Sequence, residues 1–254
     1  MIRSMCLFLF VFCLIGVVSC GGDDNPTAPT TDITLPEINQ TNTDWEVYMV
    51  VAPVQRDYRS MSLSAYYIFQ DTNPISRNDL VQIKIDNTVY DLTFDWEDDD
   101  EIGWEREHIG PINLNTTHSV QLLHNGIVRA TTTMKFPNVP NCSFPTTYDP
   151  RQAFNLAWTL DTDSPYQALR IEASYPDYQY ADWFDVIAPS LRSYQIPANA
   201  VGYHDEGEYE VILWQANLII SNRVAFISQN YVSGLYPDNR TAQITVPARQ
   251  ALMR

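Results

Sequence analysis

Short stretches of alternating apolar and polar residues dominate this chain and constrain its fold more than any other feature. The clearest cover 62–69 and 81–85, where every second residue is apolar. Side chains of a β-strand point alternately to its two faces, so this pattern predicts strands with one buried face. Helical periodicity is scarce, and the 16 prolines spread along the chain disfavour long helices. The sequence therefore predicts an all-β fold.

The first block of strands is expected over 44–137. Its clearest hairpin joins 120–124 to 127–136 through Asn125-Gly126, a favoured two-residue turn because both positions tolerate positive φ. The block holds about seven short strands, the size of a β-sandwich. In strand count and length it resembles an immunoglobulin-like sandwich.

A second block is expected over 143–234, after a linker at 138–142. The proline-rich linker is stiff and unsuited to a sheet interior, so it marks a domain boundary. The second block alternates again at 154–158 and 208–217. A tail, 235–254, is punctuated by proline and arginine and contains one possible edge strand near 242–247.

Two runs of the second block resemble fibronectin type III domains. Phe154–Trp158 is similar to the second strand of that family, and Tyr209 to Asn217 is similar to its sixth strand. The resemblance implies that Trp158 packs in the core. It also implies that Tyr209 is a tyrosine-corner residue, whose hydroxyl bonds to upstream backbone. An aromatic-rich stretch at 177–191 departs from the family pattern. Together the two blocks predict two consecutive immunoglobulin-like and fibronectin type III-like β-sandwiches.

The N-terminus has the order of a secretory signal peptide. Arg3 precedes an apolar run, 5–18, which is shorter than a membrane-spanning helix needs. The run ends in Val17-Val18-Ser19-Cys20, which resembles the lipobox of bacterial lipoproteins. The resemblance implies that residues 1–19 are removed and that Cys20 is lipidated, with more than one acyl chain for stable anchoring.

Residues 20–43 are expected to form a flexible tether behind that lipid. Their Gly, Pro, Thr, Asp and Asn cannot bury enough apolar area to offset the entropy of ordering. We expect an extracytoplasmic, lipid-anchored protein of the outer membrane. Gly21 does not resemble an inner-membrane retention signal, and Asp23-Asp24 resembles the surface-export signals of Bacteroidetes-type lipoproteins. The periplasmic and surface faces both stay open.

Charge and cysteine content narrow the partners further. The formal net charge is −16, and loss of residues 1–19 removes only Arg3, which leaves −17. Such a chain repels nucleic acid and anionic head groups. We therefore expect the lipid, and not surface charge, to attach the protein to the membrane, and we expect no nucleic-acid partner. Cys142 is the one cysteine left besides Cys20, and it is expected to act as a small apolar residue rather than a reactive thiol.

Sequence signals for catalysis are absent, and no catalytic residue is assigned. The four histidines lack zinc-ligand spacing, and neither a nucleophile elbow nor a phosphate-binding loop occurs. Each histidine is expected on a surface loop. The protein is therefore expected not to be an enzyme, with an unrecognised hydrolase as the least favoured alternative.

An acidic run offers the one candidate metal site. Carboxylates at Asp95, Glu97, Asp98 and Asp99 are ligands of the kind calcium prefers. The run is not an EF-hand, because Asp100 stands where glycine is needed. It predicts either a loose calcium loop or a solvated hairpin tip that discourages edge-to-edge pairing. No other cofactor is expected.

The richest aromatic segment, 175–184, is the candidate binding surface. Tyr178, Tyr180 and Trp183 suit a protein partner or a sugar, and the alternative is that they alternate into the core. The favoured function is a membrane-anchored binding or scaffold protein that contacts envelope proteins. The alternative is a carbohydrate-binding envelope lipoprotein.

Overall fold

The computed structural model describes residues 47–54, 57–68, 75–97, 101–160, 165–175, 180–204, 206–236 and 243–245. All regular structure within these ranges is β-strand, which confirms the predicted all-β fold. None of it is a helix able to cross a membrane. The predicted signal peptide, the predicted tether with Cys20, and the candidates Asp98, Asp99 and Tyr178 lie outside the described residues.

Sixteen strands make up the described part of the chain. In chain order they are β1 (Val47–Val54), β2 (Asp57–Ile68), β3 (Val81–Ile85), β4 (Thr88–Asp91), β5 (Thr93–Glu97), β6 (Glu101–Ile109), β7 (Thr117–His124), β8 (Ile127–Lys135), β9 (Asn141–Ser143), β10 (Phe154–Thr159), β11 (Tyr166–Ser174), β12 (Tyr180–Ile187), β13 (Ser193–Ile196), β14 (Glu208–Ser221), β15 (Val224–Tyr236) and β16 (Gln243–Thr245).

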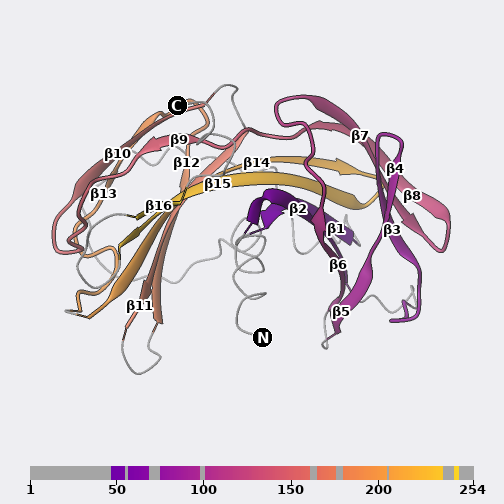
Figure 1. Cartoon of the computed structure of the whole chain (residues 1–254), viewed down its shortest axis with the longest axis horizontal. Coiled ribbons are helices and arrows are strands. Elements are labelled where there is room, and N and C mark those ends of the chain that lie inside the picture. Colours follow the sequence, from indigo (N-terminus) through magenta and orange to yellow (C-terminus); the bar gives the residue numbers. More distant parts are fainter. Residues whose placement is uncertain are drawn as a thin grey trace. The chain divides into compact units, whose positions relative to one another are not determined.

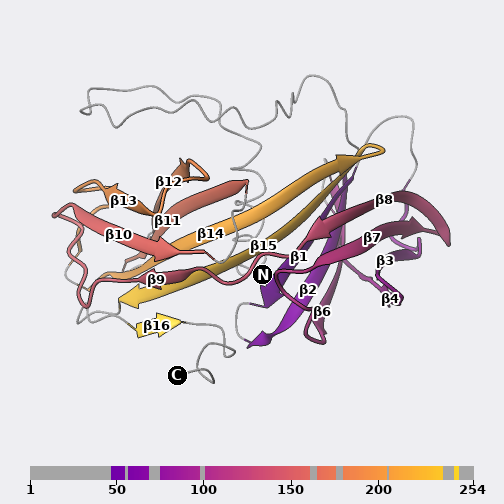
Figure 2. The same cartoon turned by 90° about the horizontal axis from the view of Figure 1, so that it is seen from above.

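These strands form three sheets (Figures 1 and 2). The largest has nine strands in the order β12-β11-β14-β15-β1-β2-β6-β5, and β16 pairs with β15 beside this path. The second sheet is β4-β3-β7-β8 and the third is β13-β10-β9. The two smaller sheets each share a hydrophobic core with one half of the large sheet.

The first core lies between β1-β2-β6 and the sheet β4-β3-β7-β8. Leu63, Ala65 and Tyr67 of β2 are buried in it, as their alternation predicts. The β7–β8 turn is also as predicted, with φ of 50° at Asn125 and 76° at Gly126.

The second core lies between β11-β14-β15 and the sheet β13-β10-β9. Trp158 is buried there, and its indole N–H donates to Gln167 at 2.8 Å. Tyr209 is buried beside it, and its hydroxyl accepts from the His204 N–H at 2.9 Å and reaches the Gly202 carbonyl at 3.3 Å. This backward bond is the geometry of a tyrosine corner.

The long β14–β15 hairpin belongs to both cores. Val224 and Phe226, near the start of β15, are buried in the first core, whereas Val232 is buried in the second. The start of β15 also pairs in parallel with β1, from Val47 opposite Val224 onward. Residues 45–254 accordingly form one compact unit.

This hairpin changes how the two predicted blocks are connected. The predicted linker at 138–142 overlaps β9, which begins at Asn141. The predicted sixth strand of the second block ended at Asn217, but β14 continues to Ser221 and reaches the first core.

Polar side chains occupy the hairpin between its two apolar ends, on the face that carries both cores. Their partners are main-chain carbonyl oxygens of the segment that leads from the first sandwich to the second. Asn230 donates to Pro137 at 3.2 Å and Ser228 donates to Lys135 at 3.0 Å; Asn217 also donates to Lys135, and Gln215 to Asn138. Buried carbonyls need such partners. We call these contacts, three from amide side chains and one from a hydroxyl, the amide bridge. They let the chain cross the sheet without pairing to another strand.

Asn230→Leu is expected to destabilise the protein by about 1–3 kcal/mol, because it leaves the Pro137 carbonyl without its donor. The measurement is urea unfolding followed by circular dichroism. Asn78→Leu, at an exposed turn position, is the control and should stay within about 0.5 kcal/mol of the parent. Equal stability of the two variants would contradict a structural role for the amide bridge.

Candidate functional site

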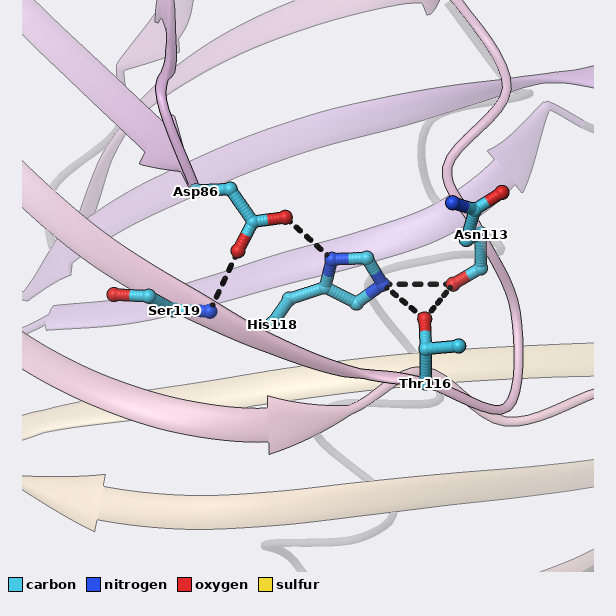
Figure 3. A network of polar contacts seen from close by, with 5 residues as sticks. All are labelled: Asp86, Asn113, Thr116, His118 and Ser119. Atoms are coloured by element: carbon cyan, nitrogen blue, oxygen red, sulfur yellow. Dashed lines mark hydrogen bonds and ion pairs between the residues drawn. The ribbon is translucent and has the colours of Figure 1, made fainter.

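The buried side chain of His118 is the centre of a polar network whose other side chains reach the surface (Figure 3). Its Nδ1 lies 2.8 Å from a carboxylate oxygen of Asp86, and its Nε2 lies 2.7 Å from the Asn113 carbonyl and 2.8 Å from the Thr116 hydroxyl. The Ser119 N–H donates to the other Asp86 oxygen at 3.0 Å. Asp86 sits in the β3–β4 turn, so the network ties that turn to the loop that precedes β7.

The network is structural rather than catalytic. An Asp-His-hydroxyl line is the arrangement that hydrolases use. Here the Thr116 hydroxyl donates its hydrogen bond to the Asn113 carbonyl. His118 is 6% exposed, and its ring stacks on that of Phe136 with centroids 4.6 Å apart. The hydrogen bond from His118 lowers the pKa of Asp86.

The expectation that every histidine lies on a surface loop is wrong for three of them. His118 and His124 belong to β7, and His108 belongs to β6. His124 packs its ring edge-on against Tyr67 at 5.4 Å and lies 3.1 Å from Asp79. His118 and His124 follow the alternation of β7, a signal that the sequence did contain, whereas His108 lies exposed at a bulge of β6 with φ of 56°.

The two aromatic candidates that the structure describes do not share one surface. Tyr180 is 52% exposed, and its hydroxyl accepts from Arg170 at 2.9 Å. Trp183 packs against the second core with its ring 6.2 Å from Tyr194. The two residues are three positions apart on β12, so they point to opposite faces of the sheet.

The described part of the acidic run lies on the edge strand β5 and the start of β6. No group of three potential metal ligands comes together among the described residues. Asp95 and Glu97 are exposed, whereas Glu101 is buried. The calcium loop and the solvated acidic tip both stay predictions.

Buried charged groups, carboxyl groups with raised pKa values and an amide without hydrogen bonds all lie on one other surface, which we call the outer face. It is the face of the nine-stranded sheet that points away from both cores. Strand register places on it, from β12 to β5, Asp182, Arg170, Glu172, Glu210, Ile212, Trp214, Tyr231, Gln229, Ile227, Val50, Tyr66, Gly103 and Glu105.

An ion cluster lies at the β12 end of the outer face. The buried Arg170 guanidinium is 3.0 Å from Glu172 and 3.3 Å from Asp182. Glu172 stands directly opposite both Asp182 and Glu210 on the neighbouring strands. Burial raises the pKa of Glu172, against the opposing effect of Arg170, and burial likewise raises the pKa of Glu210.

An aromatic and acidic cluster lies at the β5 end. The rings of Tyr66 and Trp96 flank Gly103, with ring centroids 6.2 Å apart. Burial raises the pKa of Glu105 to about 7, and the carboxylates of Asp95 and Glu107 add to this shift. Perturbed carboxyl groups beside aromatic rings are a common feature of binding sites.

The middle of the outer face is mainly apolar, and its largest polar side chain is Gln229, with the smaller Ser64 and Ser233 on the same face. Trp214 and Tyr231 pair across β14 and β15 with ring centroids 4.6 Å apart. Gln229 is 1% exposed, and its amide N–H and carbonyl groups find no hydrogen-bond partner in the described residues. A buried amide without partners is costly, so a group that reached the amide after it was uncovered would form favourable hydrogen bonds there.

Sequence reasoning missed this face, although a signal was present. Ile212, Leu213 and Trp214 are consecutive and buried, and β15 is buried almost throughout. Continuous apolar runs are typical of strands covered on both faces. Comparison with other sequences does not add to this: no protein-family model matches the chain, and no curated protein matches it.

The thiol of Cys142 is packed against the second core, and burial raises its pKa to about 12. A thiol of this kind stays protonated near neutral pH, and the thiolate is the reactive form. This agrees with the apolar role expected for Cys142.

Gly103→Ala is expected to destabilise the protein by about 1–3 kcal/mol, because overpacking forces neighbouring side chains to move. Its Cβ would lie 2.8 Å from Trp96 Nε1 and 2.9 Å from Tyr66 Cδ1. Thermal unfolding followed by tryptophan fluorescence measures the effect. Gly110→Ala is the matched control, since nothing lies within 4 Å of its Cβ. A Gly103→Ala variant as stable as this control would argue against close contact of the two rings with Gly103.

Glu105→Gln is expected to stabilise the protein at pH 8 by about 1 kcal/mol, after allowance for solvent screening of a half-buried carboxyl. The folded pKa of Glu105, about 7, lies above the ordinary value of 4.5. Stability from this group is therefore complete below pH 4.5 and is lost as the pH rises through 7. The gain should disappear at pH 4, and thermal unfolding across this range checks it. A gain independent of pH would refute the raised pKa.

Proposed function

We propose that this chain is a lipid-anchored, extracytoplasmic binding or scaffold protein, held in the outer membrane through Cys20. Its partner contacts are assigned to the outer face. One observation carries the assignment: the Gln229 amide, buried in the free chain, has unmet hydrogen bonds in the middle of an apolar and aromatic sheet face, which a partner would have to uncover. Aromatic residues with a few well-placed polar groups are typical of the energetic centres of protein interfaces.

Strand order supports the finer part of this proposal, that the sandwiches are immunoglobulin-like and fibronectin type III-like. If β1 to β8 are lettered A, B, C, C′, D, E, F and G, the first sandwich pairs A-B-E-D and C′-C-F-G. If β9 to β15 are lettered A, B, C, C′, E, F and G, the second pairs A-B-E and C′-C-F-G. Immunoglobulin-type sandwiches arrange their strands in this way.

The carbohydrate alternative is favoured by one specific feature, the β5 end of the outer face. There the Tyr66 and Trp96 rings lie near the carboxyl groups of Glu105 and Asp95. Aromatic rings beside hydrogen-bonding groups suit sugar stacking. Binding of the full chain to defined oligosaccharides, with loss in Trp96→Ala, would favour this alternative over a protein partner.

Gln229→Leu tests the protein-partner proposal. The variant is expected to be more stable than the parent by about 1 kcal/mol, because it removes an unsatisfied buried amide. It should recover the partner about tenfold less well, which corresponds to roughly 1.4 kcal/mol. The measurement is capture of partners from the native envelope with the tagged full chain, quantified by mass spectrometry, beside a melting curve.

Gln121→Leu, on β7 and away from the outer face, is the matched control and should recover the partner like the parent. Recovery that is unchanged in Gln229→Leu, or lost equally in both variants, would contradict the assignment of binding to the outer face.

A further inference from the structure

Exposed apolar side chains gather at one end of the first sandwich, which we call the hairpin end. Seven large apolar side chains are exposed among the described residues, and four of them lie here: Leu80, Ile127, Val128 and Ile220. Ile127 and Val128 are the most exposed of the four, at 68% and 47%. An exposed apolar group of this kind marks a contact surface.

Hydrogen bonds bring the parts of the hairpin end together. Leu80 and Asn125 are linked by two bonds, from the Leu80 N–H at 2.9 Å and from the Asn125 N–H at 2.8 Å. The turn of the β14–β15 hairpin is joined to β8 by Asn222, which donates to the Arg129 carbonyl. The β7–β8 turn and the β14–β15 turn therefore lie at the same end of the first sandwich (Figure 2).

The chain also enters the first sandwich at the hairpin end. β1 begins at Val47, whose N–H donates to the carbonyl of Arg223 in the β14–β15 turn at 3.3 Å. The tether proposed at residues 20–43 therefore leads into the sandwich at this end, beside the exposed apolar side chains. A flexible segment of this length spans on the order of 30 Å. A lipid on Cys20 would hold the hairpin end within reach of the bilayer.

We propose that the hairpin end is a second membrane contact, in which Leu80, Ile127, Val128 and Ile220 enter the lipid interface beside the lipid anchor. The proposal rests on the lipid anchoring proposed above. The contact is apolar rather than electrostatic, because this end carries charges of both signs. Arg77 and Arg223 lie in its turns, and β5 ends and β6 begins there with Glu97 and Glu101. Its lipid partner is therefore an uncharged interface, not an anionic one.

The test compares two valines that are equally exposed, at 47% each: Val128 at the hairpin end and Val89 on β4. Each is replaced by cysteine in the full lipidated chain and labelled with an environment-sensitive fluorophore. The half-buried Cys142, whose raised pKa keeps its thiol protonated, reacts slowly and is monitored in the parent chain. The proteins are placed in vesicles of phosphatidylcholine and phosphatidylethanolamine that contain a nitroxide-labelled lipid.

The label at position 128 is expected to shift its emission to shorter wavelength and to lose most of its intensity to the nitroxide. The label at position 89 should keep the emission that it has in solution. Adding Ile127→Asp to the Val128→Cys chain should bring the label at 128 towards the value at 89 without releasing the protein. Equal quenching at 128 and 89 would overturn the proposal.

Flotation of the vesicles separates this inference from the proposed anchor. A chain that floats with the vesicles while the label at 128 stays unquenched overturns the membrane contact and leaves the anchor intact. A full chain that does not float overturns both, because the contact was argued from the anchor. Flotation together with quenching confined to position 128 supports both.

Discussion

The amide bridge between the β14–β15 hairpin and residues 135–138 is the interaction on which the rest of the structure depends. At this point the chain leaves the first sandwich and passes over a sheet that continues into the second. Its carbonyls do not pair with a neighbouring strand there. Their hydrogen bonds come instead from the side-chain amide and hydroxyl groups of Gln215, Asn217, Ser228 and Asn230. A hairpin that was apolar along its whole length would leave these carbonyls unsatisfied. The alternation of apolar, polar and apolar blocks along one hairpin lets a single sheet carry two cores.

The continuity of this sheet also creates the outer face. In two independent sandwiches this face would be divided between two short sheets, whereas here the strands from β12 to β5 form one continuous face that points away from both cores. The face is chemically uneven, with an ion cluster around Arg170 at one end, raised carboxyl pKa values near Glu105 at the other, and apolar side chains between them. Carboxyl groups that hold their protons more tightly than usual reflect burial in a protein of large negative charge.

Much of the local structure could be predicted from the sequence because its causes are local. The Asn125-Gly126 turn, the buried face of β2 and the corner at Tyr209 each follow from residues a few positions apart. The pairing of β1 with β15 could not be predicted, since nothing near Val47 records a partner at Val224. Trp183 is a different case, because the odd spacing between it and Tyr180 already placed the two rings on opposite faces.

The parallel pairing of β1 and β15 has a consequence for how the chain acquires its fold. Val224 and Phe226 complete a core whose other members all lie between Val47 and Phe136. The first sandwich therefore cannot close while the chain is still emerging, and its contacts join residues that are distant in sequence. Folds with such a high contact order form slowly and leave apolar surface open for longer. For the exported chain proposed above, which would have to cross a membrane unfolded, this delay would keep the N-terminal half open until the C-terminal hairpin arrived.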